Sequence, residues 1–361
     1  MTLTERCSVQ PLNEASALHP SFYTDPQWLA AEQQGVFMRG WQLASHSGEL
    51  AGVGDHVVCE VAGKPILIVR NPDLSLRAFY NVCRHRAGPV ASCKGKGAKT
   101  LQCAYHGWTY ALDGQLRAAT EMQSAINFNV AGMRLPGVQV REWQGLVFVA
   151  LSDEAPAFEA VFGGIAPRIA PIDIGEMRFA KRETYVIDCN WKVYVDNYLE
   201  GYHLPYVHPG LTDQLDYRAY ETEVHEWDSL QHSPIRTGNA LYGEGNAFYY
   251  FVYPNTMFNI TPGRLQTNRV VPLGHARCSV EFDYYYSDSA QAQARAQAEQ
   301  AFSHEVQLED IGICVQVQKG LASGAYEAGR LNPKRESGVW HFQNLLRADY
   351  ARAAKDGHGG R

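Results

Sequence analysis

Short runs of strand-forming residues, each bounded by turn residues, dominate the chain between about residues 40 and 150. His56–Glu60 and Pro65–Val69 are two such runs, and a glycine-containing turn signal separates them. Leu146–Leu151 has the composition of a buried strand, and Asp113-Gly114 is typical of a β-hairpin turn. The pattern therefore predicts a small all-β domain over residues 40–150.

Residues 151–361 mix strand and helix patterns. Phe248–Tyr253 and Arg277–Tyr286 have the composition of strands in a larger sheet, whereas Trp191–Leu199 and Ala301–Leu321 have helical patterns. We therefore predict an α+β protein, in which the small β domain precedes, or is inserted into, a larger α+β domain.

The remaining segments carry weaker signals. Residues 1–39 are predicted to form a lead-in helix that packs on the larger domain. The run Ser289–Gln300 is rich in alanine and glutamine, which predicts an exposed helix start. Lys355–Arg361 is glycine-rich and is predicted to fray.

Length and composition fit this two-domain organisation. The chain has 361 residues, a net charge of −6 and ordinary apolar and charged fractions of 45% and 19%. The negative charge disfavours nucleic acid or an anionic membrane as a partner. No run reaches the roughly 18 apolar residues of a membrane helix. Met1–Gln10 has no apolar signal core, so the expected location is the cytoplasm.

Eight cysteines are too few for a disulfide scaffold in a chain of this length. In a reducing cytoplasm they are expected to be thiols or metal ligands. Six of them show no paired spacing and are interpreted as ordinary thiols: Cys7, Cys59, Cys93, Cys189, Cys278 and Cys314.

The other two cysteines belong to a metal-ligand pattern. Cys83, His85, Cys103 and His106 form C-x-H-x17-C-x2-H, so each half offers one thiolate and one imidazole. Two cysteines on one iron and two histidines on the other is the ligand set of a Rieske [2Fe–2S] centre, which transfers single electrons. Zinc is the alternative, because cysteine and histidine also bind Zn²⁺, but zinc ligand pairs more often have wider gaps. The spacing therefore predicts an iron–sulfur cluster.

The flanks of these ligands suit a cluster held on loops. Gly88-Pro89 turns the chain after the first pair, and Gly107 leaves room for backbone amides to approach the sulfides. Trp108 is expected to shield the cluster from water. The two segments CRHRAG and CAYHGWTY closely resemble the Rieske signature.

A second constellation contains His203 and His208, which would lie about 140° apart on an ideal helix. Pro205 stands between them, so a bent or unwound helix is expected to bring His208 back towards a metal bound by His203. Two histidines and one carboxylate form the facial triad of non-haem Fe(II) oxygenases, which leaves positions open for O₂. Two histidines at this spacing are, by themselves, more often surface residues of a loop. A Rieske centre needs an acceptor for its electrons, however, and this favours a metal site here.

The third ligand is expected on a late helix. An apolar stripe at helical spacing is formed there by Phe302, Val306, Ile313, Val317 and Leu321. Asp310 lies within about 40° of the centre of this stripe, and Glu309 lies about 60° away on its other side. A carboxylate on a buried stripe is costly unless it is paired or bound to metal. Asp310 is therefore the predicted ligand, and Glu309 is the fallback. The alternative without a metal is that the helix carboxylate forms a salt bridge.

The pattern D-N-x-x-E-x-x-H-x4-H, which ends at His208, resembles the catalytic motif of Rieske non-haem iron oxygenases of the large-subunit type. The resemblance implies iron binding by His203 and His208, and an acidic third ligand such as Asp310. Glu200 stands where most members have an aspartate that bridges to a cluster histidine of the neighbouring subunit, and the glutamate resembles the carnitine-oxidising branch. Asn197, one turn earlier, is expected to support the site.

The resemblance extends over most of residues 40–330 and is similar to the choline monooxygenase branch in the segments AFYYFVYPNTMFN and VQLEDIGICVQVQKGLASGAYEAGR. It implies a helix-grip catalytic domain, a homotrimer, and mono- or dioxygenation of a small organic substrate, for example choline. The chain has no G-x-G-x-x-G segment after a strand, so electrons from NAD(P)H are expected to arrive through a separate reductase or ferredoxin.

Two other functions stay open at this point. Aromatic residues crowd Phe248–Tyr253 and Phe282–Tyr286, which fits core packing, a cage for a quaternary ammonium group, or an aromatic substrate of the same enzyme family. The chain could also be a Rieske electron carrier that has no mononuclear iron.

Overall fold

The computed structural model describes residues 3–355 of the chain, which form two compact units. Phe37–Pro156 is the smaller unit, and the described parts of Met1–Val36 and Ala157–Arg361 together form the larger one. The small β unit is therefore inserted into the larger unit. The predicted fraying of Lys355–Arg361 falls, beyond Lys355, outside the described residues.

The smaller unit contains two antiparallel sheets. The six-stranded sheet has the order β1-β9-β8-β4-β3-β2, with β1 Gln42–His46, β2 His56–Val61, β3 Lys64–Arg70, β4 Leu76–Tyr80, β8 Gly137–Trp143 and β9 Leu146–Ala150. The three-stranded sheet contains β5 Leu101–Gln102, β6 Thr109–Tyr110 and β7 Leu116–Ala118. The strands and hairpin turns predicted in this region are confirmed. The turn between β2 and β3 has Ala62 and Gly63 at φ of 51° and 70°, as expected for a tight two-residue hairpin.

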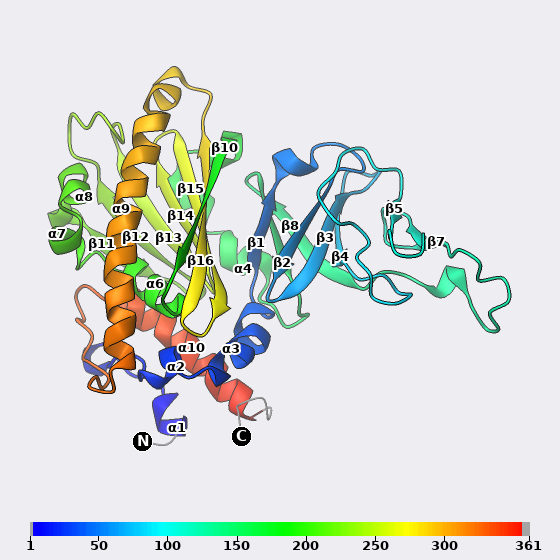
Figure 1. The fold of residues 1–361 in the computed structure, drawn as a ribbon. Helices are drawn as coiled ribbons and strands as arrows, with labels where there is room; N and C mark the ends of the chain where they lie inside the picture. Colours follow the sequence, from blue (N-terminus) through cyan, green and yellow to red (C-terminus); the bar gives the residue numbers. More distant parts are fainter. Residues whose placement is uncertain (1–2, 356–361) are drawn as a thin grey trace. The chain divides into compact units, whose positions relative to one another are not determined.

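The larger unit is built on one seven-stranded antiparallel sheet with the order β10-β16-β15-β14-β13-β12-β11 (Figure 1). Its strands are β10 Arg178–Ile187, β11 Glu221–Val224, β12 Asp228–Pro234, β13 Asn246–Val252, β14 Thr256–Thr261, β15 Arg264–Gly274 and β16 Arg277–Tyr286. The last six strands follow one another in both sequence and space, which requires only short connections. The predicted α+β fold class, with an antiparallel sheet and helices, is confirmed.

Helices cover one face of this sheet and close its ends (Figure 1). The longer helices are α6 Trp191–Tyr198, α9 Ala290–Ala322 and α10 Ser337–Lys355, and the short ones are α1 Leu3–Arg6, α2 Ser21–Thr24, α3 Gln27–Glu32, α4 Phe158–Phe162, α5 Ile165–Ile169, α7 Leu204–Val207 and α8 Pro209–Gln214. Helix α6 contacts both α9 and the strands β15 and β16, so it lies between the long helix and the sheet.

The expectation of a single lead-in helix over residues 1–39 is wrong. This segment forms α1, α2, α3 and a π-helical turn, Gln33–Phe37. Pro20 and Pro26 stand immediately before α2 and α3. A proline has no amide proton and fits only the first turn of a helix, so each one starts a new helix.

Helix α9 begins where the alanine- and glutamine-rich run predicted, because the hydroxyl of Ser289 accepts from the amide of Ala292 (3.2 Å) and caps it. Its buried face differs from the predicted apolar stripe: Ile313 and Val317 are 37% and 44% exposed. The buried positions lie one residue further along and include Gln307 and Cys314. Polar residues occupy this face because it borders a polar cavity instead of an apolar core.

A fully buried ion pair fastens α6 to the N-terminal segment. Lys192 on α6 lies 2.5 Å from Glu32 of α3, with side-chain exposures of 0% and 1%. The same carboxylate accepts from Trp191 Nε1 and from the hydroxyl of Tyr350 on α10, both at 2.6 Å. Burial lowers the pKa of Lys192, although the Glu32 charge opposes the shift. One carboxylate therefore joins three helices.

Within the described residues, no helix is both long and apolar enough to cross a membrane. None of the eight cysteines forms a disulfide, and the Sγ atoms of Cys189 and Cys278 lie 4.0 Å apart, at hydrogen-bond distance. The prediction that the six cysteines outside the cluster motif form no disulfides is confirmed.

Candidate metal centres and the adjoining cavity

Two turns of the smaller unit carry the four predicted cluster ligands. In the turn after β4, the amide of Ala87 donates to the carbonyl of Cys83 (3.1 Å), and in the turn after β5 the amide of Gly107 donates to the carbonyl of Cys103 (3.0 Å). Ala87 and Gly107 both have positive φ, at 59° and 70°. Glycine adopts this conformation without strain, which explains its place after the second histidine. The two halves of the motif thus share one local geometry.

The side chains of these two turns face one another. Cys83 and Cys103 are buried, and the ring centroids of His85 and His106 are 4.5 Å apart. His85 stacks on Trp108 at 4.8 Å, as expected of a tryptophan that shields the site. His85 Nδ1 is buried and has no hydrogen-bond partner in the protein. A buried polar atom of this kind needs a ligand, and two thiols with two imidazoles fit a [2Fe–2S] cluster.

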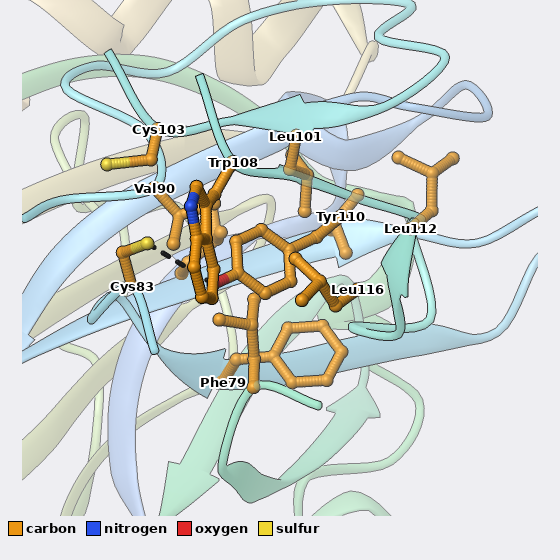
Figure 2. Packing of buried hydrophobic residues seen from close by; sticks show 12 residues of the cluster. Phe79, Cys83, Val90, Leu101, Cys103, Trp108, Tyr110, Leu112 and Leu116 are labelled. Atoms are coloured by element: carbon orange, nitrogen blue, oxygen red, sulfur yellow. Dashed lines mark hydrogen bonds between the residues drawn. The ribbon is translucent and has the colours of Figure 1, made fainter. Parts of the chain in front are cut away.

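Tyr110 is a functional candidate that the sequence reasoning missed. Its hydroxyl lies 3.2 Å from Cys83 Sγ, as Figure 2 shows, and accepts from the amide of Arg84 (3.0 Å). Since Arg84 occupies an acceptor position of the hydroxyl, its proton is free to point at the sulfur. The available signal was the alternation of Trp108, Thr109 and Tyr110, in which Trp108 and Tyr110 are both buried in one cluster.

Replacing Tyr110 with phenylalanine is expected to lower the midpoint potential of the cluster by roughly 40–65 mV. A hydrogen bond to the sulfur stabilises the more negative, reduced cluster by about 1–1.5 kcal/mol, and 59 mV corresponds to a factor of ten for one electron. A redox titration followed by EPR measures the shift. Tyr105→Phe is the control, because the Tyr105 hydroxyl contacts Arg86 and not a cysteine. An equal shift in both variants would contradict the role of Tyr110.

Three side chains of the larger unit converge as a second candidate centre. One ligand atom from each of His203, His208 and Asp310 lies within 4.8 Å of the other two. Asp310 Oδ1 is 2.9 Å from His208 Nε2 and 3.9 Å from His203 Nε2. His208 is buried, and the other two are partly buried. Two imidazole nitrogens and one carboxylate oxygen around a common point fit a facial triad.

A glutamate contacts the Nδ1 atom of each histidine. Glu200 Oε1 lies 2.6 Å from His203 Nδ1, and Glu309 Oε2 lies 2.6 Å from His208 Nδ1. A carboxylate at Nδ1 keeps the proton there, which leaves the lone pair of Nε2 for a metal. Glu309, the fallback ligand, therefore lies on the far side of His208 from Asp310.

Asn197 and the local charges complete this arrangement. Asn197 on α6 donates to Asp310 Oδ1 at 2.5 Å, which orients the carboxylate as its predicted supporting role requires. Burial opposes a charge on His208, but the carboxylates of Asp310 and Glu309 outweigh burial and raise its pKa.

The chain path between the two histidines is interrupted twice. Helix α6 ends at Tyr198, α7 occupies Leu204–Val207, and His208 lies between α7 and α8. The expected interruption is confirmed, but Pro205 lies in the first turn of α7 and does not kink it. Glu200 closes the bend by accepting from the amides of Tyr202 and of His203, the latter at 3.1 Å.

A cavity adjoins this centre on the side of the sheet, between α6, α9 and strands β12–β16. Five of its lining residues are tyrosines: Tyr194, Tyr198, Tyr220, Tyr242 and Tyr249. Of the aromatic strand residues noted in the sequence, Tyr249 and Phe282 line the cavity and others, such as Tyr250 and Phe251, are buried core. The remaining four tyrosines come from helices and connections, where no local pattern marks them.

Most of the sheet residues that line the cavity are polar. They are Gln231, Asn259, Thr261, Arg264, Gln266 and Asn268. Arg264, Gln266 and Asn268 alternate along β15, so all three point to one face of the sheet. Gln266 accepts from Ser303 (2.9 Å) and donates to Asn268 (2.8 Å), which fixes this row of side chains.

A second cavity shares part of its lining with the first. Glu200, Asn197 and His203 line both cavities. The second cavity also contains the partly exposed apolar residues Ile313 and Val317. Glu200 therefore reaches from the candidate iron ligand to a surface-facing hollow.

Comparison with known proteins agrees with both centres. Residues 40–136 match the Rieske [2Fe–2S] domain, and residues 174–352 match the ring hydroxylating alpha subunit (catalytic domain). The chain belongs to the Rieske non-haem iron oxygenase family, as the catalytic alpha subunit. A member of this family uses a [2Fe–2S] cluster and a mononuclear iron, takes electrons from a partner protein and acts on a small molecule.

Within the family, the chain is similar to oxygenases of quaternary amines. It is 36% identical to choline monooxygenase of Arabidopsis thaliana, over 93% of this chain and 83% of that protein. It is 32% identical to the carnitine monooxygenase oxygenase subunit of Escherichia coli K12, over 92% and 93% of the two chains. A solved structure of a quaternary ammonium Rieske monooxygenase superimposes with a TM-score of 0.85 at 28% identity, over 95% of this chain and 99% of that one.

Proposed function

We propose that this protein oxidises a small quaternary ammonium compound with O₂ at the centre formed by His203, His208 and Asp310. The observation that carries the proposal is the cavity that joins these three side chains to five tyrosines. The relatives that share most of the chain act on choline or carnitine, which supports the same substrate class.

The tyrosines suit a cation that cannot form hydrogen bonds. A trimethylammonium group is attracted to aromatic faces, and the attraction grows when water is excluded. Burial raises the pKa of Tyr194, Tyr198 and Tyr249 well above the ordinary value, so all three rings stay neutral. The second candidate, an aromatic hydrocarbon, is disfavoured because it would leave the buried atoms Arg264 Nε, Thr261 Oγ1 and Gln307 Nε2 without partners.

The chain's own residues are assigned as follows. Cys83, His85, Cys103 and His106 would hold the [2Fe–2S] cluster, and His203, His208 and Asp310 would hold Fe(II). When bound, the cluster supplies single electrons and the Fe(II) activates O₂.

The neighbouring residues position these ligands. Glu200 and Glu309 hold the Nδ1 protons of the two histidines, and Asn197 orients Asp310. The buried tyrosines exclude water from the substrate's ammonium group and align it beside the three ligand atoms.

We infer that Glu200 also links this centre to the cluster of a second copy of the chain, in a homotrimer. Its carboxylate borders the second cavity, where Ile313 and Val317 expose apolar surface that a partner subunit would cover. The structure of the related quaternary ammonium monooxygenase gave insights into inter-subunit electron transfer in that protein. We further infer a separate NAD(P)H-dependent reductase or ferredoxin as the electron donor. A reducing, cytoplasmic compartment fits a chain whose eight cysteines form no disulfide.

Glu200→Gln is expected to slow turnover by roughly 10–100-fold even when the mononuclear iron site is fully loaded, although the lost charge also weakens iron binding. The amide keeps the shape of the side chain but loses the charge that links the two centres. Single-turnover oxidation of the pre-reduced cluster, followed by its visible absorbance, measures the rate of electron transfer out of the cluster.

Glu309→Gln is the matched control for this variant, since it makes the same change behind the other histidine. It should weaken iron binding without slowing cluster oxidation in the iron-loaded enzyme. Turnover of Glu200→Gln at the wild-type rate would disprove the bridging role.

Substrate-stimulated O₂ uptake by the holoenzyme with a surrogate reductase tests the proposed function. The panel contains choline, glycine betaine, carnitine, benzoates and anilines. Stimulation by at least one quaternary ammonium compound is expected, and stimulation by aromatics alone would refute the proposal. Iron analysis separates the enzyme from a simple electron carrier: about three irons per chain are expected for the oxygenase, and two for the carrier.

A further inference from the structure

We propose that the cavity contains an anion subsite centred on Arg264, and that the substrate is a zwitterion whose carboxylate binds there. This inference rests on the proposed function and deepens it. It divides the quaternary ammonium class into compounds that carry a carboxylate, which this subsite accepts, and compounds such as choline, which carry only the cation.

The position of Arg264 supports this assignment. Arg264 opens β15, is 4% exposed, and lines the same cavity as His203, His208 and Asp310. One of its terminal nitrogens donates to Gln266, whereas Nε is buried and has no hydrogen-bond partner in the protein. A guanidinium keeps its charge at all physiological pH values and presents a planar fork of donors that matches a carboxylate.

The charge around Arg264 is only partly balanced. Within the described part of the chain, no carboxylate forms an ion pair with it inside 4.0 Å. Burial opposes the charge of Arg264, but Tyr242 and then Glu299 on α9 raise its pKa. The Glu299 carboxylate also lies 3.5 Å from Arg295, which shares it. Two arginines thus share one buried glutamate, which leaves one formal positive charge that a substrate carboxylate would neutralise.

Other donors that line the cavity also await a partner. Thr261 Oγ1, Tyr249 OH and Gln307 Nε2 are buried and have no hydrogen-bond partner in the protein. A buried donor of this kind is destabilising if nothing binds it. A hydroxyl can donate, and so can an amide nitrogen, so these three groups and Arg264 Nε form a set of donors suited to the oxygens of an anion.

The rest of the cavity accommodates the other end of a zwitterion. The tyrosines offer ring faces to the ammonium group, while Arg264 already lies against the rings of Tyr242 and Tyr284, at 5.8 and 5.9 Å. Tyr194 and Tyr198, on α6 beside Asn197, remain with Tyr220 and Tyr249 as rings for the ammonium group. A substrate with a cation alone would instead leave Arg264 without a counter-charge at its end of the cavity.

Equilibrium binding to the holoenzyme tests the subsite with three ligands: γ-butyrobetaine, its methyl ester and choline. The ester has the same cation and nearly the same length but no negative charge. Wild-type protein is expected to bind γ-butyrobetaine at least 10-fold more tightly than either of the other two by isothermal calorimetry. In Arg264→Gln this preference should disappear, because the carboxylate loses its charged donor while the cation site remains.

Arg269→Gln is the matched control. It removes another arginine of β15, which pairs with Glu281 (3.0 Å) and does not line the cavity, so the 10-fold preference should persist. Arg264→Lys covers the case in which the glutamine variant fails to fold, and it should retain part of the preference. Circular dichroism verifies the fold of each variant.

Two results would overturn the anion subsite. The first is that wild-type protein binds choline or the ester as tightly as γ-butyrobetaine. The second is that Arg264→Gln loses the same fraction of its affinity for all three ligands. Either result leaves the proposed function intact, because a quaternary ammonium compound still binds. Failure of all three ligands to bind wild-type protein would refute the proposed function and the subsite together.

Discussion

Asp310→Ala is expected to lower the iron content from about three to about two atoms per chain and to abolish turnover. The carboxylate faces the Nε2 atoms of both His203 and His208, and no other acid of the described residues lies within reach of both. Two imidazoles alone hold Fe(II) weakly. Metal analysis gives the count, and the visible spectrum should show that the cluster is unaffected.

Glu309→Ala is the control for this prediction, because it removes the adjacent carboxylate of the same helix. Glu309 touches His208 only at Nδ1, so its loss should weaken iron binding by roughly 10–100-fold without abolishing it at saturating iron. If Glu309→Ala lost the iron and Asp310→Ala kept it, the assignment of the third ligand would be reversed.

Lys192→Met is expected to destabilise the larger unit by about 3–5 kcal/mol, which corresponds to a fall of roughly 10 °C in its thermal midpoint. The substitution leaves the Glu32 carboxylate fully buried with two neutral donors, Trp191 and Tyr350, and no counter-charge. Differential scanning calorimetry measures the change.

The double variant Glu32→Gln with Lys192→Met should recover most of this loss, because it removes both buried charges. Arg178→Met, which breaks an exposed pair with Asp288, serves as the control and should move the midpoint by no more than about 2 °C. A double variant as unstable as Lys192→Met alone would show that packing, and not the unpaired charge, causes the loss.

The cluster motif could be predicted because its geometry is local. Each half places a cysteine and a histidine within one turn closed by a positive-φ residue, so the spacing along the chain already determines which side chains lie together. The role of Tyr110 was not predicted, since the contact of its hydroxyl with Cys83 depends on how two loops meet.

Asp310 was predicted as the third ligand from the angular positions of residues around a helix. The buried face predicted for that helix was only partly correct. Ile313 and Val317, assigned to the buried stripe, are substantially exposed. Asp310 still lies on the buried face, because Gln307 and Cys314 fall three residues before it and four after it. Helix phase could not separate the roles of Asp310 and Glu309, since both acids contact His208 from opposite sides.

By itself, the sequence determined the class of the protein, the two metal-ligand motifs and the α+β fold, because these follow from spacing and periodicity within short segments. Only the tertiary structure decided which residues surround the substrate. Tyr194, Tyr220, Tyr249, Arg264 and Gln307 come from a helix, a connection, two strands and a second helix, and no short-range pattern relates them. They become neighbours because the sheet and two helices enclose one cavity, and the unpartnered donors there are defined by what packing leaves buried.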